Sequence, residues 1–561
     1  MQDEQEQRMI GAAEKLFYIH KDIEKVLGLF RAGLREEENL LQGADHPRIP
    51  DLAGPIENDW KTLEKYGCLE PHSREPEEVV RGIVRDFFPG AVRWESSWSN
   101  FNVGTTVNAV ASAVSMLASA TNIYLINDEL AGNSILAEKM VTNILAKLAG
   151  LDPRQAWGIF TFGGTGTHLY GLRIGLQKAC PEADRAGMQG NCNVLFTEDS
   201  HFGNMRSAEW LGVGKDNMIL VKARKDRTTD LSDLKSKARK VLNDGRRLGC
   251  IVINGGTTYN HTIDPIRAVV EIRDQLAGEF GLPYKPHIHV DSVIGWSWLM
   301  FRGYDFESNS LKIPSAALAK VKRQYERVAE IGLVDSWGID FHKGVGACPL
   351  PCSIVMINNN GELRNLKRGQ DKMFAMHQLA FQYSSLNPVE YTLETSRASS
   401  APLAALASLH ALGQDWYRMH LSNLVHVADC QRREIDLHGD MAVINKFSDG
   451  FATFFRIYPK TANAKAAFRI ENEESHSEAM DLAKSTNEYM ERFFKWANKH
   501  KIGKGEGPLY SKSKCLWYSP SGVGLSALKL YPTSPYINEN DARRCVKAIR
   551  LQKDEFDAHS R

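Results

Sequence analysis

The chain has 561 residues, of which 43% are hydrophobic and 24% charged, and its formal net charge is +1. This length allows a large core and two or three domains, and the near-zero charge excludes the basic field that nucleic-acid binding requires. The longest uncharged apolar stretch, residues 107–120, is too short and too rich in Ala and Ser to span a bilayer. We therefore expect a small-molecule partner, and neither nucleic acid nor a membrane.

The first hundred residues are dominated by charged amphipathic segments at 4–34 and 76–88, separated by the turn-rich stretch 43–54. Both segments are predicted helices that cannot form a core alone. Residues 1–105 are therefore expected to be an N-terminal helical segment.

From residue 107 to about residue 358, apolar β-branched runs alternate with helical patterns. The predicted strands are 193–197, 218–221, 250–254, 287–291 and 353–358, and the predicted helices between them are 164–178, 231–243 and 265–280. Continuous apolar strands separated by helices imply a mostly parallel, doubly wound sheet covered on both faces. Residues 106–400 are the predicted large α/β domain.

The last part of the chain has a different pattern. It contains a helix at 401–412 that continues through 415–432, an alternating strand at 451–458, a long amphipathic helix at 477–500, and short strands at 515–518 and 528–531. Residues 401–561 are therefore predicted to form a small α+β domain.

The nine cysteines follow no paired spacing, and their odd number in a chain without a secretory leader indicates a reducing compartment, by default the cytoplasm. Cys348 and Cys352 lie close together, but no second Cys or His pair with zinc-like spacing accompanies them. They are predicted to be structural thiols, and no metal is expected.

Lys343 stands in the segment Asp340-Phe341-His342-Lys343-Gly344, which is followed by an apolar run. A lysine held between two buried strands is costly to keep as a free ammonium, and a neutral amine forms an imine with an aldehyde cofactor. Lys343 is thus a candidate Schiff-base lysine for pyridoxal phosphate. Asp291 ends another strand and would keep the pyridine nitrogen protonated. The competing interpretation is a surface lysine and a helix-capping aspartate.

A glycine-rich turn, residues 160–168, opens a helix after a short apolar run. Its glycines let backbone amides approach an anion, and Thr165 adds a hydroxyl donor, so the turn suits a cofactor phosphate. It lacks the Gly-x-Gly-x-x-Gly spacing and the lysine of a P-loop. A simple tight turn, or a variant loop of a nucleotide-binding oxidoreductase, stays open.

His201 follows the strand that ends at residue 197, and Thr258 follows the strand that ends at residue 254. An imidazole at this edge of the sheet is placed to stack on a flat aromatic ring, although a lone loop histidine is more often structural. Ligands of open parallel sheets sit outside the carboxyl ends of the strands. These loops, Asp291 and Lys343 are therefore expected to converge on one crevice.

The order of these motifs resembles group II pyridoxal-phosphate-dependent amino-acid decarboxylases of fold type I, over residues 100–397. The resemblance implies phosphate binding by Gly164, Thr165 and His342, with Asp340 where many members have Asn. It further implies that His201 stacks on the cofactor ring and that Thr258 contacts the cofactor. Asp291 would pair with the pyridine nitrogen, and Lys343 would form the imine. Arg397 would bind the carboxylate of the substrate. An ordinary salt bridge is the other interpretation of Arg397.

The chain departs from this family at several positions. Gly166 and His168 replace the usual Glu and Asn of the phosphate turn, and the stretch 291–343 is longer than in animal aromatic decarboxylases and carries Trp296 and Trp298. These tryptophans are more typical of a core than of a pocket wall. Asp340 resembles archaeal and bacterial tyrosine decarboxylases and also sphingosine-phosphate lyase.

The activity implied is α-decarboxylation of a neutral L-amino acid, aromatic such as tyrosine or aliphatic such as methionine or valine, to the amine and carbon dioxide. The alternative is a carbon–carbon lyase like sphingosine-phosphate lyase. The resemblance implies a homodimer wrapped by the N-terminal helices. It also implies a proton donor on a mobile loop, for which His377 and Tyr383 are the candidates.

Overall fold

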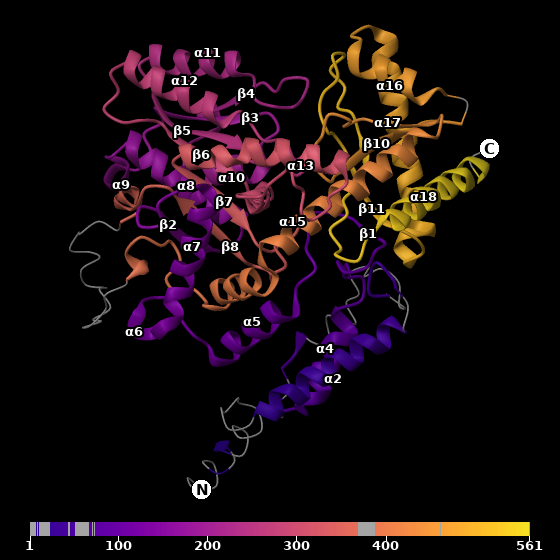
Figure 1. The fold of residues 1–561 in the computed structure, drawn as a ribbon, viewed down its shortest axis with the longest axis horizontal. Coiled ribbons are helices and arrows are strands. Elements are labelled where there is room, and N and C mark those ends of the chain that lie inside the picture. The colour runs from indigo at the N-terminus through magenta and orange to yellow at the C-terminus, as the bar shows by residue number, and fades with distance from the viewer. Residues whose placement is uncertain are drawn as a thin grey trace.

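The computed structural model of the protein describes residues 7, 9–10, 23–42, 45–50, 67–69, 71, 73–367, 387–460 and 462–559. Two sheets organise them, one formed by strands from the purple-to-red part of the chain and one formed mainly by strands from its orange-to-yellow part (Figure 1). The helices α2 (Ile23–Leu41) and α4 (Pro76–Phe87) pack against each other and extend away from both sheets. They coincide with parts of the two predicted N-terminal helices.

The large sheet has seven strands in the order β2-β8-β7-β6-β5-β3-β4. Their bounds are β2 Trp157–Thr161, β3 Cys192–Thr197, β4 Met218–Val221, β5 Arg247–Asn254, β6 His287–Asp291, β7 Ser336–Asp340 and β8 Ser353–Ile357. Strands β4, β3, β5, β6 and β7 run parallel to one another, and β8 is antiparallel to both of its neighbours, β7 and β2. The predicted mostly parallel sheet is confirmed, although β2 and β7 were not predicted.

Helices cover both faces of this sheet, as the alternation along β5 shows. Ile251 and Ile253 pack in the cluster that contains side chains of α12, whereas Cys250 and Val252 pack with side chains of α8. The helices of this region are α5 Ala109–Thr121, α6 Asp128–Ala131, α7 Ile135–Ala149, α8 Gly164–Ala179, α9 Ala183–Ala186, α10 Phe202–Trp210, α11 Leu231–Asn243, α12 Ile266–Glu279 and α13 Ser315–Val328. The three predicted helices correspond to α8, α11 and α12.

The small sheet has the strand order β1-β11-β12-β10-β9. Its strands are β1 Ser99–Asn100, β9 Met441–Val443, β10 Thr453–Ile457, β11 Leu509–Ser513 and β12 Ala527–Leu530, and the helices of this part are α15 Ser400–Asp436, α16 Ala464–Glu473, α17 Ser477–His500 and α18 Glu539–His559. The strand predicted at 515–518 is wrong, because this stretch forms only a single bridge between Tyr518 and Gly524. The three-part division of the chain stays a prediction, since β1 brings residues of the first part into this sheet.

The long helix α15 links the two sheets and bends once. Gly413 has φ 67° and ψ 166°, which is not helical, so the predicted helix pair 401–412 and 415–432 is one element with a break at the glycine. Among the described helices, none combines the length and apolar character that a membrane crossing needs.

Several residues singled out in the sequence lie in the core. Trp296 and Trp298 are 1% and 0% exposed, as predicted for core residues. The thiols of Cys348 and Cys352 donate to the carbonyl oxygens of Ala404 and Ala401 at the start of α15. The two cysteines therefore fasten this helix to the loop after Lys343, as expected of structural thiols.

Candidate active site

The carboxyl ends of β3, β5, β6 and β7 lie along one edge of the large sheet, because these strands are parallel neighbours. A cavity of about 20 Å³ at this edge is lined by Asp199, His201, Asn254, Gly256, Thr257, Thr258, Tyr259, Asp291 and Val293. The structure thus brings together His201, Thr258 and Asp291, which the sequence placed in different loops. Asp291 is the last residue of β6, and Lys343 follows the neighbouring strand β7 at the same edge.

Lys343 lies in the loop between β7 and β8, with a side chain that is 20% exposed. Its Nζ atom is 2.9 Å from Oδ2 of the fully buried Asp340. The backbone beside it is fixed by a hydrogen bond from the amide of Gly344 to the carbonyl of Val103, 2.7 Å long. The lysine therefore has a defined position at the end of β7, and it is not a freely moving surface residue.

The start of α8 forms an uncapped helix N-terminus beside this lysine. Gly163 has φ 134°, a conformation that L-residues rarely adopt, and no side chain in the described part of the chain caps the helix. A Cβ atom added to Gly164 would lie 2.9 Å from Oδ2 of Asp340. A helix start whose first amides are not capped by a described side chain has the dipole and the donors that a phosphate requires.

His342 lies at the same place. Its Nε2 atom is 3.6 Å from Oδ2 of Asp340, and its Nδ1 atom is 3.1 Å from the carbonyl oxygen of Cys352, which orients the ring. Burial lowers the pKa of His342, against the opposing effect of Asp340. A neutral imidazole with one nitrogen toward the helix start can donate or accept there.

Asp291 is held as a carboxylate. Its Oδ2 atom accepts a hydrogen bond from Nδ2 of Asn204, 2.9 Å away, and lies 3.4 Å from Nε2 of His168. Burial alone would raise the pKa of Asp291, but His168, His201, Lys343 and the Asn204 hydrogen bond together lower it. A buried anion without a fully charged partner of its own suits a ligand that carries a proton on a ring nitrogen.

His201 caps the N-terminus of α10, because its Nδ1 atom accepts a hydrogen bond from the amide of Gly203 at 3.1 Å. This contact places the ring proton on Nε2. Burial lowers the pKa of His201, so the ring is neutral near pH 7. A neutral, oriented imidazole next to Asp291 is suited to cover the face of a flat ligand.

Arg397 does not line the cavity. Its guanidinium lies 2.6 Å from the carboxylate of Glu138 and also donates to the carbonyl of Phe160, and both charged side chains are buried. This pairing corresponds to the ordinary salt bridge that the sequence left open, and it leaves the site without the expected cation for a substrate carboxylate.

Lys529 is a buried cation that the sequence analysis missed. Its Nζ atom donates to Oδ1 of Asn102 at 2.9 Å, and no carboxylate in the described part of the chain pairs with it. Burial lowers the pKa of Lys529 to about 8. The backbone of Val103, next to Asn102, contacts Gly344 in the loop that carries Lys343. The signal was a lysine inside the apolar run 527–531, the same signal that pointed to Lys343.

The candidate proton donors His377 and Tyr383 lie outside the described residues, in the gap between 367 and 387. Their predicted role stays a prediction.

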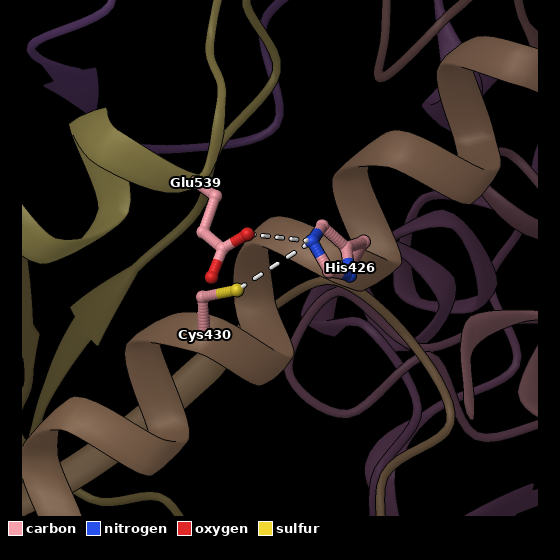
Figure 2. Close-up of side chains that lie close together, drawn as sticks. All are labelled: His426, Cys430 and Glu539. Carbon is pink, nitrogen blue, oxygen red and sulfur yellow. Dashed lines mark hydrogen bonds and ion pairs between the residues drawn. The ribbon is translucent and has the colours of Figure 1, made fainter. Parts of the chain in front are cut away.

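A second group of potential ligand side chains lies between α15 and α18. Figure 2 shows His426 and Cys430 on α15 with Glu539 at the start of α18. Nε2 of His426 is 3.4 Å from Glu539 and 3.8 Å from the sulfur of Cys430. Two arginines complete the cluster, since Arg433 donates to the sulfur and Arg543 to the carboxylate. Each of these groups thus has protein partners, and we assign no metal to them.

A family model described as "Pyridoxal-dependent decarboxylase conserved domain" matches residues 70–456. The L-2,4-diaminobutyrate decarboxylase of Rhizobium meliloti (strain 1021) is 28% identical over 305 residues, which cover 54% of this chain and 54% of the relative. The chain therefore matches about half the length of this curated relative.

Solved structures share the fold over almost the full chain. Mouse CSAD in apo form has a TM-score of 0.74 and 16% identity, covering 94% of this chain and 98% of that chain. Oryza sativa TDC, solved with PLP and tryptamine, has a TM-score of 0.73 and 16% identity, covering 96% of this chain and 99% of that chain. These likenesses confirm the predicted fold class.

Proposed function

The chain belongs to the pyridoxal-dependent decarboxylase family, and on that premise we propose that it releases the α-carboxyl group of an L-amino acid as carbon dioxide. One observation carries the proposal most directly: Asp291 ends strand β6, and Lys343 follows the neighbouring strand β7 at the same edge of the sheet. A primary amine and a carboxylate are the groups that the aldehyde and the ring nitrogen of pyridoxal phosphate need.

The residues of this edge fit the cofactor. The uncapped start of α8 at Gly164 offers free backbone amides, and Thr165 and His342 add polar side chains beside it, so these residues would hold the phosphate. Asp291 would pair with the ring nitrogen, Thr258 would contact the ring substituents, and His201 would lie against its face. Asp340 sits beside Gly164, where it would meet the phosphate with a negative charge.

When bound, the cofactor draws electrons from the α-carbon of the substrate. Lys343 would supply the amine that anchors the aldehyde and would release the product. The carboxylate of Asp291, which Asn204 holds in place, would keep a proton on the ring nitrogen. The neutral ring of His201 would lie over one face of the cofactor and exclude water from it.

Lys529 is our candidate for the cation that meets the substrate carboxylate, in place of Arg397. It is buried without an anionic partner among the described residues, and its partner Asn102 adjoins the segment that contacts the Lys343 loop. A buried ammonium gains most from a ligand that brings the missing negative charge. Arg397, by contrast, already has Glu138.

A neutral substrate side chain is supported by the charges along the cavity. Asp199 is the acidic residue beside His201, but Arg227 holds its carboxylate through a two-pronged contact, with Nε 2.8 Å away. The pair leaves little net charge to attract a cationic side chain. The curated relative, L-2,4-diaminobutyrate decarboxylase, makes the diamino acid the natural comparison substrate.

A homodimer is supported by the surface of the N-terminal helices. Phe30 and Leu34 on α2 and Ile83 and Phe87 on α4 are between 39% and 51% exposed. Apolar side chains gathered on a helix pair that extends from the body of the protein are typical of a surface that a second subunit covers. The proton donor, His377 or Tyr383, would act in this assembly.

The test is a screen of the twenty amino acids, L-2,4-diaminobutyrate and a phospho-amino-alcohol with the cofactor-loaded protein, in which carbon dioxide, amine and aldehyde are all measured. We expect carbon dioxide and amine in equal amounts from a neutral aromatic or aliphatic substrate, and none with Lys343→Ala. Preference for L-2,4-diaminobutyrate would refute only the substrate class. Aldehyde and an amine phosphate formed from a phospho-amino-alcohol, without carbon dioxide, would instead establish the lyase.

A further inference from the structure

A row of hydrogen-bonding side chains runs from Asp291 into the interior. Nε2 of His168 is 3.4 Å from Oδ2 of Asp291, and its Nδ1 is 3.3 Å from Nε2 of His289. Nδ1 of His289 is 2.9 Å from Oγ of Ser336, which lies 2.7 Å from Nε2 of His287. All five side chains are buried, with exposed fractions between 0% and 6%. The row therefore has no access to bulk water along its length.

The side chains of the row fit between β6 and α8 because glycines occupy the facing positions of α8. His287, His289 and Asp291 alternate along β6 and point to the same face. A Cβ atom on Gly171 would lie 2.3 Å from Nδ1 of His289, and one on Gly175 would lie 2.8 Å from Cβ of His287. His168 occupies the same face of α8 one turn earlier. The helix and the strand are thus complementary at each position of the row.

The charges in this region fix the protonation of the row. Burial lowers the pKa of all three histidines. The pKa of His287 falls to about 4, and the pKa of His289 falls well below its usual range. The charged groups facing the row are Asp291, Asp340 and Lys343 at the site, and Asp335, Lys178 and Arg273 at the far end. All three imidazoles are therefore neutral near pH 7, and each carries one proton.

With one proton on each ring, only one arrangement satisfies every contact. Asp291 is a carboxylate and can only accept, so His168 carries its proton on Nε2 and exposes a bare Nδ1. His289 must then donate from Nε2, Ser336 donates to Nδ1 of His289, and His287 donates to Ser336. The leftover atom is Nδ1 of His287, which is a buried acceptor without a partner among the described residues. A buried acceptor without a hydrogen-bond partner costs less free energy than a buried N–H donor without one.

We propose that His168, oriented by His289, Ser336 and His287, is a positioning residue that keeps Asp291 charged and fixed opposite the ring nitrogen of the cofactor. The inference rests on the proposed function and adds a role for the His-x-His-x-Asp strand and for His168, where the family's usual residue is Asn. If His289 is lost, the proton of His168 is free to move to Nδ1. A bare Nε2 would then face the carboxylate, and the negative charge on Asp291 would lose its donor.

The test compares His289→Leu with His289→Gln, because the glutamine amide can still donate to His168 whereas leucine cannot. Each variant is loaded with pyridoxal phosphate labelled with ¹⁵N in the ring, and the solid-state ¹⁵N spectrum reports whether that nitrogen is protonated. The matched control is His420→Leu, which removes a buried histidine outside the row. Activity is measured as kcat and KM.

We expect the wild type, His289→Gln and His420→Leu to show a protonated ring nitrogen. His289→Leu should shift the resonance toward the neutral ring and lower kcat at least tenfold, with KM changed less than twofold. A His289→Leu variant that matches His420→Leu in spectrum and kcat overturns the inference. If His289→Leu does not fold, His168→Leu replaces it with the same expectations. A wild type that takes up no cofactor would refute the proposed function itself, which separates the two failures.

Discussion

The Nζ atom of Lys343 lies 2.9 Å from Oδ2 of Asp340, three residues earlier in the chain. The same carboxylate adjoins Gly164 at the start of α8, where a phosphate would bind. Asp340 would therefore place a carboxylate beside the phosphate, an arrangement that would weaken cofactor binding.

Asp340→Asn is accordingly expected to tighten cofactor binding. The amide removes the repulsion, and its oxygen still accepts the hydrogen bond that Ser353 donates to Oδ1. We expect the Kd for pyridoxal phosphate to fall about tenfold, which corresponds to about 1.4 kcal/mol. Fluorescence titration of the apoprotein measures it. Asp440→Asn, which removes a carboxylate paired with Lys553, is the control and should leave Kd unchanged. Weaker binding by Asp340→Asn would place the phosphate elsewhere.

Asp291→Asn should retain the cofactor and lose turnover. A neutral amide cannot hold a proton on the ring nitrogen, so the electron-withdrawing power of the ring is lost, and we expect kcat to fall by a factor on the order of 10³ or more. Cofactor content and kcat are measured on the same preparation. Near-normal kcat with full cofactor content would show that Asp291 has only a structural role.

Lys529 gives the substrate affinity a distinct pH dependence. Its amine has a pKa of about 8, so it is charged below that pH and loses its proton as the pH rises through it. We expect KM to be low below pH 8 and to rise above it, while kcat changes less. Lys529→Arg, which stays charged, should move the rise to higher pH, and Lys529→Met should raise KM at least tenfold at pH 7. A KM that is flat through pH 9 in the wild type would exclude Lys529 from substrate binding.

Buried neutral histidines should make the fold sensitive to acid. Burial lowers the pKa of His261 to about 3 and the pKa values of His287 and His420 to about 4. Unfolding exposes these rings, which then take up protons below pH 6.5, so the stability present above that pH is lost as the pH falls toward 4. Each ring contributes up to about 1.4 kcal/mol per pH unit.

The measurement is the urea midpoint between pH 7 and pH 4.5. We expect the midpoint of the wild type to fall steadily over this range, and that of His420→Leu to fall less steeply, although its stability at pH 7 is lower. Parallel slopes in the two proteins would show that His420 takes up no proton on unfolding.

The local patterns of the sequence predicted much of the site. The strand 287–291 was found as one of the apolar runs, with Asp291 at its end, and the start of α8 was found from its glycines. Strand β7 was missed because Ser336, Gly338 and Asp340 interrupt its apolar pattern, and only pairing with β6 and β8 makes it a central strand.

Contacts between distant residues were beyond the reach of these patterns. The sequence gives no sign that Arg397 is paired, because its partner Glu138 lies 259 residues away along the chain. Lys529 meets Asn102 across 427 residues. Tertiary packing decides which charged residues are paired. The periodicity and spacing of a sequence do not reveal these pairs.

The central claim is that the cofactor is anchored at Lys343. The loaded protein is reduced with borohydride, digested, and analysed by mass spectrometry for the lysine that carries the reduced cofactor. We expect the label on Lys343 alone, and neither yellow colour nor label in Lys343→Ala. A label on the buried Lys529, or a label retained in Lys343→Ala, would contradict the account.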